Sequence, residues 1–366
     1  MQEHSHALGA VKVGSPMTVN NLSVFPLLAE TDHAPDYITL AQALEAGTGV
    51  ITEVSTSGSV PQAVFRNIGD KPVLLLDGEE LIGCKQNRIL NLTIMAAPNA
   101  ETLIPVTCVE MGRWSSVSRE FRSSKHFLFA ELRAEKVAQV NRHISFSGEK
   151  SADQGEIWRH LSMKSERMGS SSSSSAMSGI YQQREREIER DLAALQTEEG
   201  QVGAVFAING EVVGIDLFDC ASTLQSYFGR VASGYVLDAV DRRTEQALQS
   251  EMSRRGSASP SDEDFSEYLA ESDRVPANNP ALEAAQNDAP PSVESVQSML
   301  RRTAGVTEKR FPGVGIGEDI RLDTPAIAGA ALVVSERLVH LCAFDMETSE
   351  RSQYRNRRAE RRRFDA

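Results

Sequence analysis

The chain has 366 residues, of which 40% are apolar, and a formal net charge of −13. This length is long for one domain and short for three, and the apolar content is a little low for a globular protein, which indicates a folded core diluted by linker or unfolded segments. The negative charge argues against nucleic-acid binding by the surface as a whole.

The charge is unevenly distributed. Residues 244–296 hold eleven carboxylates against three arginines, whereas residues 351–363 hold seven arginines and one glutamate. We predict a disordered acidic insertion over residues 250–291, because this composition cannot bury enough apolar area to offset its ordering entropy. For the basic tail, residues 347–366, two interpretations stay open: a solvated terminus, or a weak, salt-dependent contact with nucleic acid or an acidic partner.

The four cysteines form no CxxC pair, and no Cys/His zinc spacing occurs, so we expect reduced, mostly buried thiols and no metal site. The first residues lack the cationic and apolar regions of a secretion signal, and the apolar runs are far shorter than the roughly 20 residues that span a membrane. We therefore expect a cytoplasmic protein without membrane contact. The cofactors and the oligomeric state stay unknown at this stage.

Along the chain, residues 1–19 predict a flexible arm, and residues 20–346 predict a single domain. Short apolar segments punctuated by Gly, Pro, Asn and Asp predict strands at 24–28, 50–55, 63–67, 73–76, 80–82, 90–95 and 103–109. Helical spacing predicts helices at 36–46 with Asp36 as the N-cap, and at 127–139, 181–196, 224–249 and 292–303. The serines of 169–178 indicate a linker or mobile loop. Strands at this spacing favour an α+β fold with a mostly antiparallel β core and peripheral helices.

Two hairpins, at residues 202–218 and 328–344, resemble each other. Each has a small-residue entry, an apolar strand, a turn and a second strand that ends in Phe-Asp. An internal repeat and simple convergence of two hairpins both account for this similarity.

One polar motif follows an apolar strand and an Asp77-Gly78 turn: Lys85-Gln86-Asn87-Arg88. If the strand continues through these residues, Lys85 and Asn87 share one face. The cations suit a phosphate or carboxylate, and the amides suit an amide or a sugar hydroxyl. The alternative is a solvated strand end whose amides hold a turn.

A second motif, Glu110-Met111-Gly112-Arg113-Trp114, follows another apolar strand. Trp114 beside Arg113 suits stacking on a purine or nicotinamide ring, and the alternative is an Arg–Glu ion pair capped by a half-buried Trp. Glu79 and Glu110 are the candidate catalytic carboxylates.

The segments Leu76–Arg88, with Asn91, and Pro105–Trp114 together resemble the ARG-and-Rhodanese-Phosphatase-superfamily-associated protein domain family. The resemblance covers roughly residues 20–240 and 290–346, and that family takes its name from its association with ADP-ribosylglycohydrolases and phosphatases. It implies a role in NAD or ADP-ribose metabolism. The family positions carried over by the resemblance are Gly78, Glu79, Gly83, Lys85, Gln86, Asn87, Arg88, Asn91, Glu110, Gly112, Arg113 and Trp114.

The sequence therefore leads to one main expectation and one alternative. The main expectation is a nucleotide-binding protein that binds, and by extension hydrolyses, an ADP-ribose- or NAD-derived ligand. The predicted ligand-binding residues are Lys85, Gln86, Asn87, Arg88, Asn91, Arg113 and Trp114. The alternative is a non-enzymatic interaction or scaffold module whose polar motifs are structural, so whether the protein is an enzyme stays open.

Overall fold

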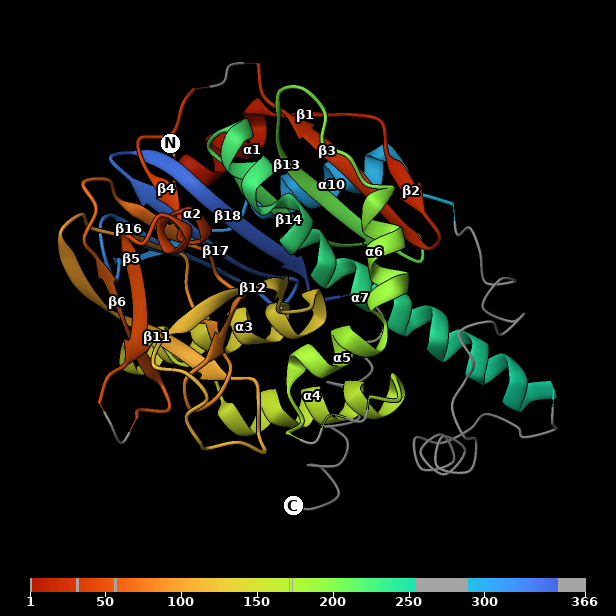
Figure 1. Cartoon of the computed structure of the whole chain (residues 1–366). Coiled ribbons are helices and arrows are strands. Elements are labelled where there is room, and N and C mark those ends of the chain that lie inside the picture. The colour runs from red at the N-terminus through yellow and green to blue at the C-terminus, as the bar shows by residue number, and fades with distance from the viewer. Residues whose placement is uncertain are drawn as a thin grey trace.

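The computed structural model describes residues 2–30, 33–55, 58–170, 172, 174–254 and 289–347, with the side chains of 247–254 left aside. Residues 255–288 of the predicted acidic insertion and all but the first residue of the basic tail lie outside this described part. Figure 1 shows the elements in chain order.

A nine-stranded sheet organises the described chain, in the order β1-β3-β13-β14-β18-β17-β16-β15, with β2 also paired to β3. Its pairings are antiparallel, which confirms the predicted class of β core. The strands are β1 (Lys12–Val13), β2 (Met17–Val19), β3 (Leu22–Leu28), β13 (Gln201–Ile208), β14 (Glu211–Phe218), β15 (Glu308–Pro312), β16 (Glu318–Asp323), β17 (Ile327–Val334) and β18 (Arg337–Asp345).

The two similar hairpins, β13–β14 and β17–β18, are equivalent in detail. Gly203 pairs with Leu217 as Gly329 pairs with Ala343, and both ladders shift register at the same step, between residues 206 and 207 and between 332 and 333. Both turns hold two consecutive residues at positive φ, Asn209-Gly210 and Ser335-Glu336, as the two-residue turn of a twisted hairpin requires. The structure therefore favours an internal repeat over convergence.

The hairpins are joined through β14 and β18, where Gly214 pairs with Phe344 and Phe218 with His340. Gly214 and His340 are equivalent positions of the two hairpins, as are Phe218 and Phe344. Because each pair joins one hairpin to the other in exchanged order, an approximate two-fold axis passes between Asp216 and Cys342. The repeat extends outward: a hairpin, β2–β3 or β15–β16, flanks each side, and a helix precedes each of these hairpins.

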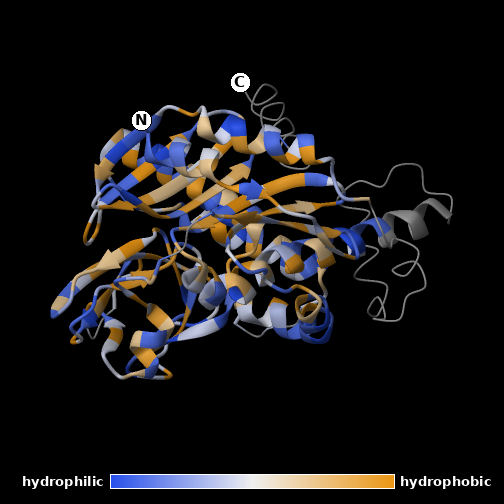
Figure 2. Cartoon of the chain, turned by 90° about the horizontal axis from the view of Figure 1, so that it is seen from above, coloured by the Kyte–Doolittle hydropathy of each residue, from blue (hydrophilic) through white to orange (hydrophobic). Residues whose placement is uncertain are grey.

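Helices cover both faces of the large sheet (Figure 2). On one face α1 (Glu3–Ala10) packs against α10 (Val293–Ala304) over an apolar layer that includes Leu8, Leu27 and Met299. On the other face lie α3 (Ala130–Ser147) and α7 (Ala221–Arg254), which together with α4 (Gln154–Arg167), α5 (Met177–Gln183) and α6 (Glu185–Ala193) enclose the largest core cluster.

The N-terminal residues differ from the prediction. The expected flexible arm forms α1, β1 and β2 instead, with Leu8 buried and the His4 ring hydrogen-bonded to Glu308. The sequence pattern was too polar to reveal this helix, because α1 is held by packing against α10 rather than by an apolar face of its own.

Between β3 and β13 the chain builds a second, smaller β unit. Its closed barrel has the order β11-β6-β5-β12-β8-β9, and a three-stranded sheet, β10-β7-β4, lies beside it. The strands are β4 (Ile38–Thr39), β5 (Gly49–Glu53), β6 (Gln62–Asn67), β7 (Val73–Leu75), β8 (Glu79–Gly83), β9 (Arg88–Leu90), β10 (Ile94–Ala96), β11 (Ala100–Cys108) and β12 (Phe121–Phe127). In the second repeat β16 and β17, the equivalents of β3 and β13, are joined by a short turn. This unit, helix α2 (Leu40–Glu45) and α3–α6 are therefore an insertion into the first repeat.

Two helices begin or break where the sequence did not predict. Helix α2 (Leu40–Glu45) is capped by Thr39, which forms a capping box with Gln42, and not by Asp36, because Ile38–Thr39 first pair with β7. The helix predicted at 181–196 is broken at Arg184 into α5 and α6. None of the helices in the described ranges is both long and apolar enough to cross a lipid bilayer.

Candidate functional site

The two polar motifs lie in direct contact at the end of the barrel. Residues 84–87 form the turn between β8 and β9, so the condition under which Lys85 and Asn87 would share one face of a strand is not met; Cys84, with φ 45°, follows the end of β8. Gln86 Nε2 donates to the Glu110 carbonyl oxygen at 2.8 Å, and the Asn87 N–H donates to Glu110 Oε2 at 3.0 Å. The second motif therefore closes over the first.

Arg113 locks this contact. Its guanidinium donates to the Cys84 carbonyl oxygen at 2.7 Å, to Asn87 Oδ1 at 3.2 Å and to Glu110 Oε2 at 2.5 Å. Burial opposes ionisation of Glu110, but hydrogen bonds from Arg113, Ser174 and the Asn87 N–H outweigh it and hold the pKa of Glu110 below its usual value. Arg113 and Glu110 thus form the ion pair of the structural alternative.

Arg88 serves a different set of partners. Its side chain is fully buried, donates to the Ser59 carbonyl oxygen at 2.6 Å and to the Val60 carbonyl oxygen, and pairs with Glu53 at 3.2 Å. These contacts tie the start of β9 to the segment between β5 and β6. A guanidinium with this set of partners is committed to the barrel and has little left for a ligand.

The remaining predicted binding residues are scattered. Lys85 Nζ lies 5.5 Å from the ring centroid of Trp114, which is 47% exposed. Asn91 is buried beside β11, where Thr107 donates to it at 2.7 Å and it donates to the Lys150 carbonyl oxygen at 3.2 Å. Lys85 and Trp114 therefore present a cation–π pair at the surface, whereas Asn91 lies inside the fold.

The serine-rich segment completes the motif cluster. The Gly112 N–H donates to the Ser174 carbonyl oxygen at 2.9 Å, the Met177 N–H donates to the Val109 carbonyl oxygen at 2.9 Å, and Glu110 forms a β-bridge with Ala176. The C-terminal end of this segment is therefore hydrogen-bonded to the second motif. In this it differs from a linker that only connects two parts of the chain.

The adjacent carboxylates of β8 point to opposite sides of the strand. Glu79 pairs with Arg230 of α7 and accepts from Ser123 at 3.0 Å. Glu80 is fully buried. Burial, opposed by a hydrogen bond from Ser124 and reinforced by the nearby Glu110 carboxylate, raises the pKa of Glu80 to about 7.

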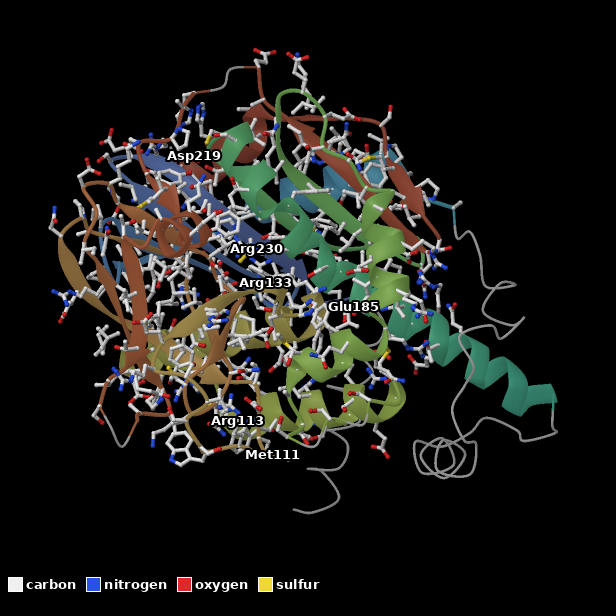
Figure 3. The ribbon with its side chains drawn as sticks, in the orientation of Figure 1. Met111, Arg113, Arg133, Glu185, Asp219 and Arg230 are labelled. Carbon is white, nitrogen blue, oxygen red and sulfur yellow. The ribbon has the colours of Figure 1, made fainter. Side chains whose placement is uncertain are left out.

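A groove with a volume of about 510 Å³ opens on the far side of Glu79, between α2, β12 and α7. We call it the α2–β12 groove. Three cations line it, and two carboxylates and two serine hydroxyls lie among them: Arg122, Lys125, Arg230, Glu45, Glu120, Ser123 and Ser124. Figure 3 shows Arg113 of the second motif well apart from Arg230, so the motif cluster and the groove are separate places.

Arg230 is the innermost cation of the groove. Its side chain is 14% exposed, and one terminal nitrogen bonds Glu79 and Ser123. The other, Nη2, is buried, and the guanidinium lies over the Tyr227 ring, 4.7 Å from its centroid. Lys125 reaches Glu185 at 2.5 Å and Glu189 at 3.3 Å, but both of these pairs are exposed and exchange with solvent at little cost.

A buried charge network joins the barrel unit to the large sheet. Arg133 of α3 lies 3.0 Å from Asp77 and 2.8 Å from Asp216 of β14. His340 Nε2 lies 3.3 Å from Asp216, and its Nδ1 is 2.9 Å from Thr93 Oγ1. The sequence offers no sign that two acidic partners of this helix are buried opposite it.

Lys136, one turn after Arg133, is also fully buried. Its ammonium donates to the Leu90 and Asn91 carbonyl oxygens at 3.0 and 3.1 Å and pairs with Asp77. Burial lowers the pKa of Lys136 to about 7. The three-residue spacing of Arg133 and Lys136 places both side chains on one face of the helix. This spacing is the one signal by which the sequence could have revealed the network.

The chain matches the family described as ARG and Rhodanese-Phosphatase-superfamily-associated Protein domain, over residues 10–280 and 275–344. No curated protein and no solved structure matches it significantly. The matched residues include the barrel unit, both polar motifs and the second repeat, and they make up well over half of the chain. The chain therefore belongs to the ARG and Rhodanese-Phosphatase-superfamily-associated Protein domain family.

Proposed function

We propose that the chain binds a small phosphate-bearing molecule of the ADP-ribose or NAD-derived class in the α2–β12 groove. The observation that carries the proposal is Arg230, a nearly buried guanidinium that lines the groove and is held there by Glu79. A guanidinium fixed in this way suits a phosphate oxygen, because a charge-assisted hydrogen bond is roughly twice as strong as a neutral one.

The rest of the lining supports the same ligand class. Arg122 and Lys125 add two cations to the groove, which suits a diphosphate. The carboxylates of Glu45 and Glu120 can accept hydrogen bonds from ribose hydroxyls, and serine hydroxyls bond either group. A volume of about 510 Å³ falls within the range of small-molecule sites.

The proposal concerns binding and moves the site away from most of the residues predicted from sequence. Of the two carboxylates predicted as catalytic, Glu79 lies behind Arg230 and Glu110 is bound by Arg113 in the motif cluster. Both accept hydrogen bonds that hold local structure. The rival function, an interaction or scaffold module, is favoured by one specific observation: the terminal nitrogens of Arg88 and Arg113 bond carbonyl oxygens and carboxylates of the chain itself.

A ligand screen on the full-length chain separates the two functions. ADP-ribose, NAD, AMP and inorganic phosphate are tested by thermal shift and then by calorimetric titration, since a ligand that binds the native state raises the melting temperature. We expect ADP-ribose or NAD to bind, Arg122→Ala to weaken the affinity about tenfold or more, and Arg66→Ala, exposed on the outside of the barrel, to leave it unchanged. Absence of binding by all four compounds would overturn the proposal in favour of the rival.

A further inference from the structure

Three potential metal ligands meet where β14 ends and α7 begins. Asp219 and Cys220 lie immediately before α7, and His33 lies in the segment that precedes β4. One ligand atom from each residue lies within 4.8 Å of the other two. From these residues we propose a binding site for a divalent transition metal of the zinc class, formed by His33 Nε2, Asp219 Oδ2 and Cys220 Sγ.

Asp219 carries the argument. Its side chain is 1% exposed, and Oδ1 accepts a hydrogen bond from the Tyr37 hydroxyl at 2.5 Å. The other oxygen, Oδ2, is buried and makes no hydrogen bond among the described residues; it has long ion-pair contacts with Arg337 Nε at 3.3 Å and His33 Nε2 at 3.5 Å. Such contacts satisfy a buried carboxylate oxygen only in part, and a metal ion bound to it would remove the remaining cost.

The donor set and its spacing fit the zinc class. Imidazole nitrogen, thiolate sulfur and carboxylate oxygen are the ligands that Zn²⁺ takes in proteins, at about 2.0–2.3 Å. In a tetrahedral site with such bonds, two donor atoms lie about 3.4 Å apart, close to the 3.5 Å between His33 and Asp219. Three protein ligands leave the fourth position to water or a small ligand.

The surroundings orient the ligands. Tyr37 fixes the Asp219 carboxylate and is itself 2.8 Å from Thr223 Oγ1, which also lies 3.1 Å from Cys220 Sγ. Such hydrogen bonds behind the ligands are characteristic of metal sites. The three proposed ligands and the residues that orient them do not line the α2–β12 groove. Arg230 lies further along α7 (Figure 3), about 15 Å from Cys220 at 1.5 Å per residue.

One cation competes with a metal at this place. Arg337 Nε lies 3.3 Å from Asp219 Oδ2, while the same guanidinium bonds Asp36 at 2.5 Å. The ion would displace Arg337 from Asp219, and Arg337 would keep Asp36. Removing the arginine should therefore tighten metal binding, a result that a merely structural Asp219–Arg337 pair does not produce.

The test uses Co²⁺ as a spectroscopic probe on the full-length reduced chain. We expect one Co²⁺ per chain with a thiolate-to-metal charge-transfer band in the near ultraviolet, lost on addition of Zn²⁺. Cys220→Ser should abolish the band, His33→Ala should weaken binding about tenfold or more, and Arg337→Gln should strengthen it.

The matched control is Cys108→Ser, a buried thiol of β11 in the barrel, which should keep the band, and circular dichroism checks that each variant is folded. Absence of a thiolate band in the wild-type chain, or the same band in Cys220→Ser, would overturn the proposal. Since Arg230→Gln should leave the band intact, failure of the groove as a nucleotide site does not affect this result.

Discussion

Asp216 and Cys342 face each other across the β14–β18 pair, on the approximate two-fold axis that relates the two hairpins. Their side chains break that symmetry. Asp216 accepts hydrogen bonds from Arg133 and from Tyr235 at 3.1 Å, whereas Cys342 Sγ lies 3.7 Å from Asp77. Asp77 of the barrel unit is the second carboxylate that pairs with Arg133. This one guanidinium therefore joins the inserted unit to the sheet.

The first prediction concerns that junction. Arg133→Met removes the cation and leaves two carboxylates buried, which should lower the free energy of unfolding by about 3–5 kcal/mol. Arg66→Ala removes an exposed partner of Glu101 and should cost no more than about 1 kcal/mol. Urea unfolding of both variants measures the difference, and equal losses would show that Arg133 does not hold the two parts together.

The second prediction concerns Glu80, whose pKa burial raises to about 7 from the ordinary 4.5. An acid whose folded pKa is raised binds more protons in the folded state, so its contribution to stability is present below the unfolded pKa and is lost as the pH rises toward 7. Glu80→Gln cannot ionise. The variant should therefore gain up to about 3 kcal/mol relative to wild type between pH 4.5 and pH 7.5. A stability difference that stays constant over this range would rule out the titration.

The third prediction separates structure from ligand binding in the motif cluster. Arg113→Ala removes the hydrogen bonds that Arg113 donates to the Cys84 carbonyl oxygen, Asn87 and Glu110. The substitution should destabilise the fold by about 2 kcal/mol. Its affinity for any ligand of the α2–β12 groove should match that of Arg119→Ala, an exposed neighbour. A large loss of nucleotide affinity in the first variant alone would return the motifs to the binding site.

The sequence was sufficient where local chemistry decides the structure. Short apolar runs placed most barrel strands, and Ser292 capped α10 where a helix was predicted. It was insufficient where the partner is distant or is backbone. The 121–127 segment, with Arg122, Ser123 and Lys125 at its centre, gives no strand signal, yet β12 pairs with β8 and lines the groove. The contact between the two motifs depends largely on carbonyl oxygens, which every residue has and no sequence pattern displays.

The site residues follow the same division. The residue types of the two motifs show which side chains are cationic, but not that the partners of Arg88 are Glu53 and carbonyl oxygens of the segment between β5 and β6. Arg230 belongs to a helix that was predicted for its apolar spacing, and it faces a groove formed with α2 and β12. The sequence alone does not specify which elements this far apart in the chain become neighbours.

The last prediction uses two glycines of α7 as each other's control. Both lie inside α7, and glycine costs about 1 kcal/mol relative to alanine in a helix interior. A Cβ at Gly229 would meet nothing within 4 Å, whereas a Cβ at Gly234 would lie 2.8 Å from the Leu128 carbonyl oxygen and 3.2 Å from Phe129 Cα. Gly234 therefore lets α7 cross directly over the segment before α3.

The same substitution should consequently have opposite effects at the two positions. Gly229→Ala should stabilise the protein by about 0.5–1 kcal/mol, since it lowers the entropy of the unfolded chain and adds no contact. Gly234→Ala should destabilise it by about 1–3 kcal/mol, because backbone atoms of residues 128 and 129 must move to admit the methyl group. Denaturant unfolding of the two variants beside wild type measures both signs. A stabilising Gly234→Ala would mean that α7 and this segment are further apart than the structure places them.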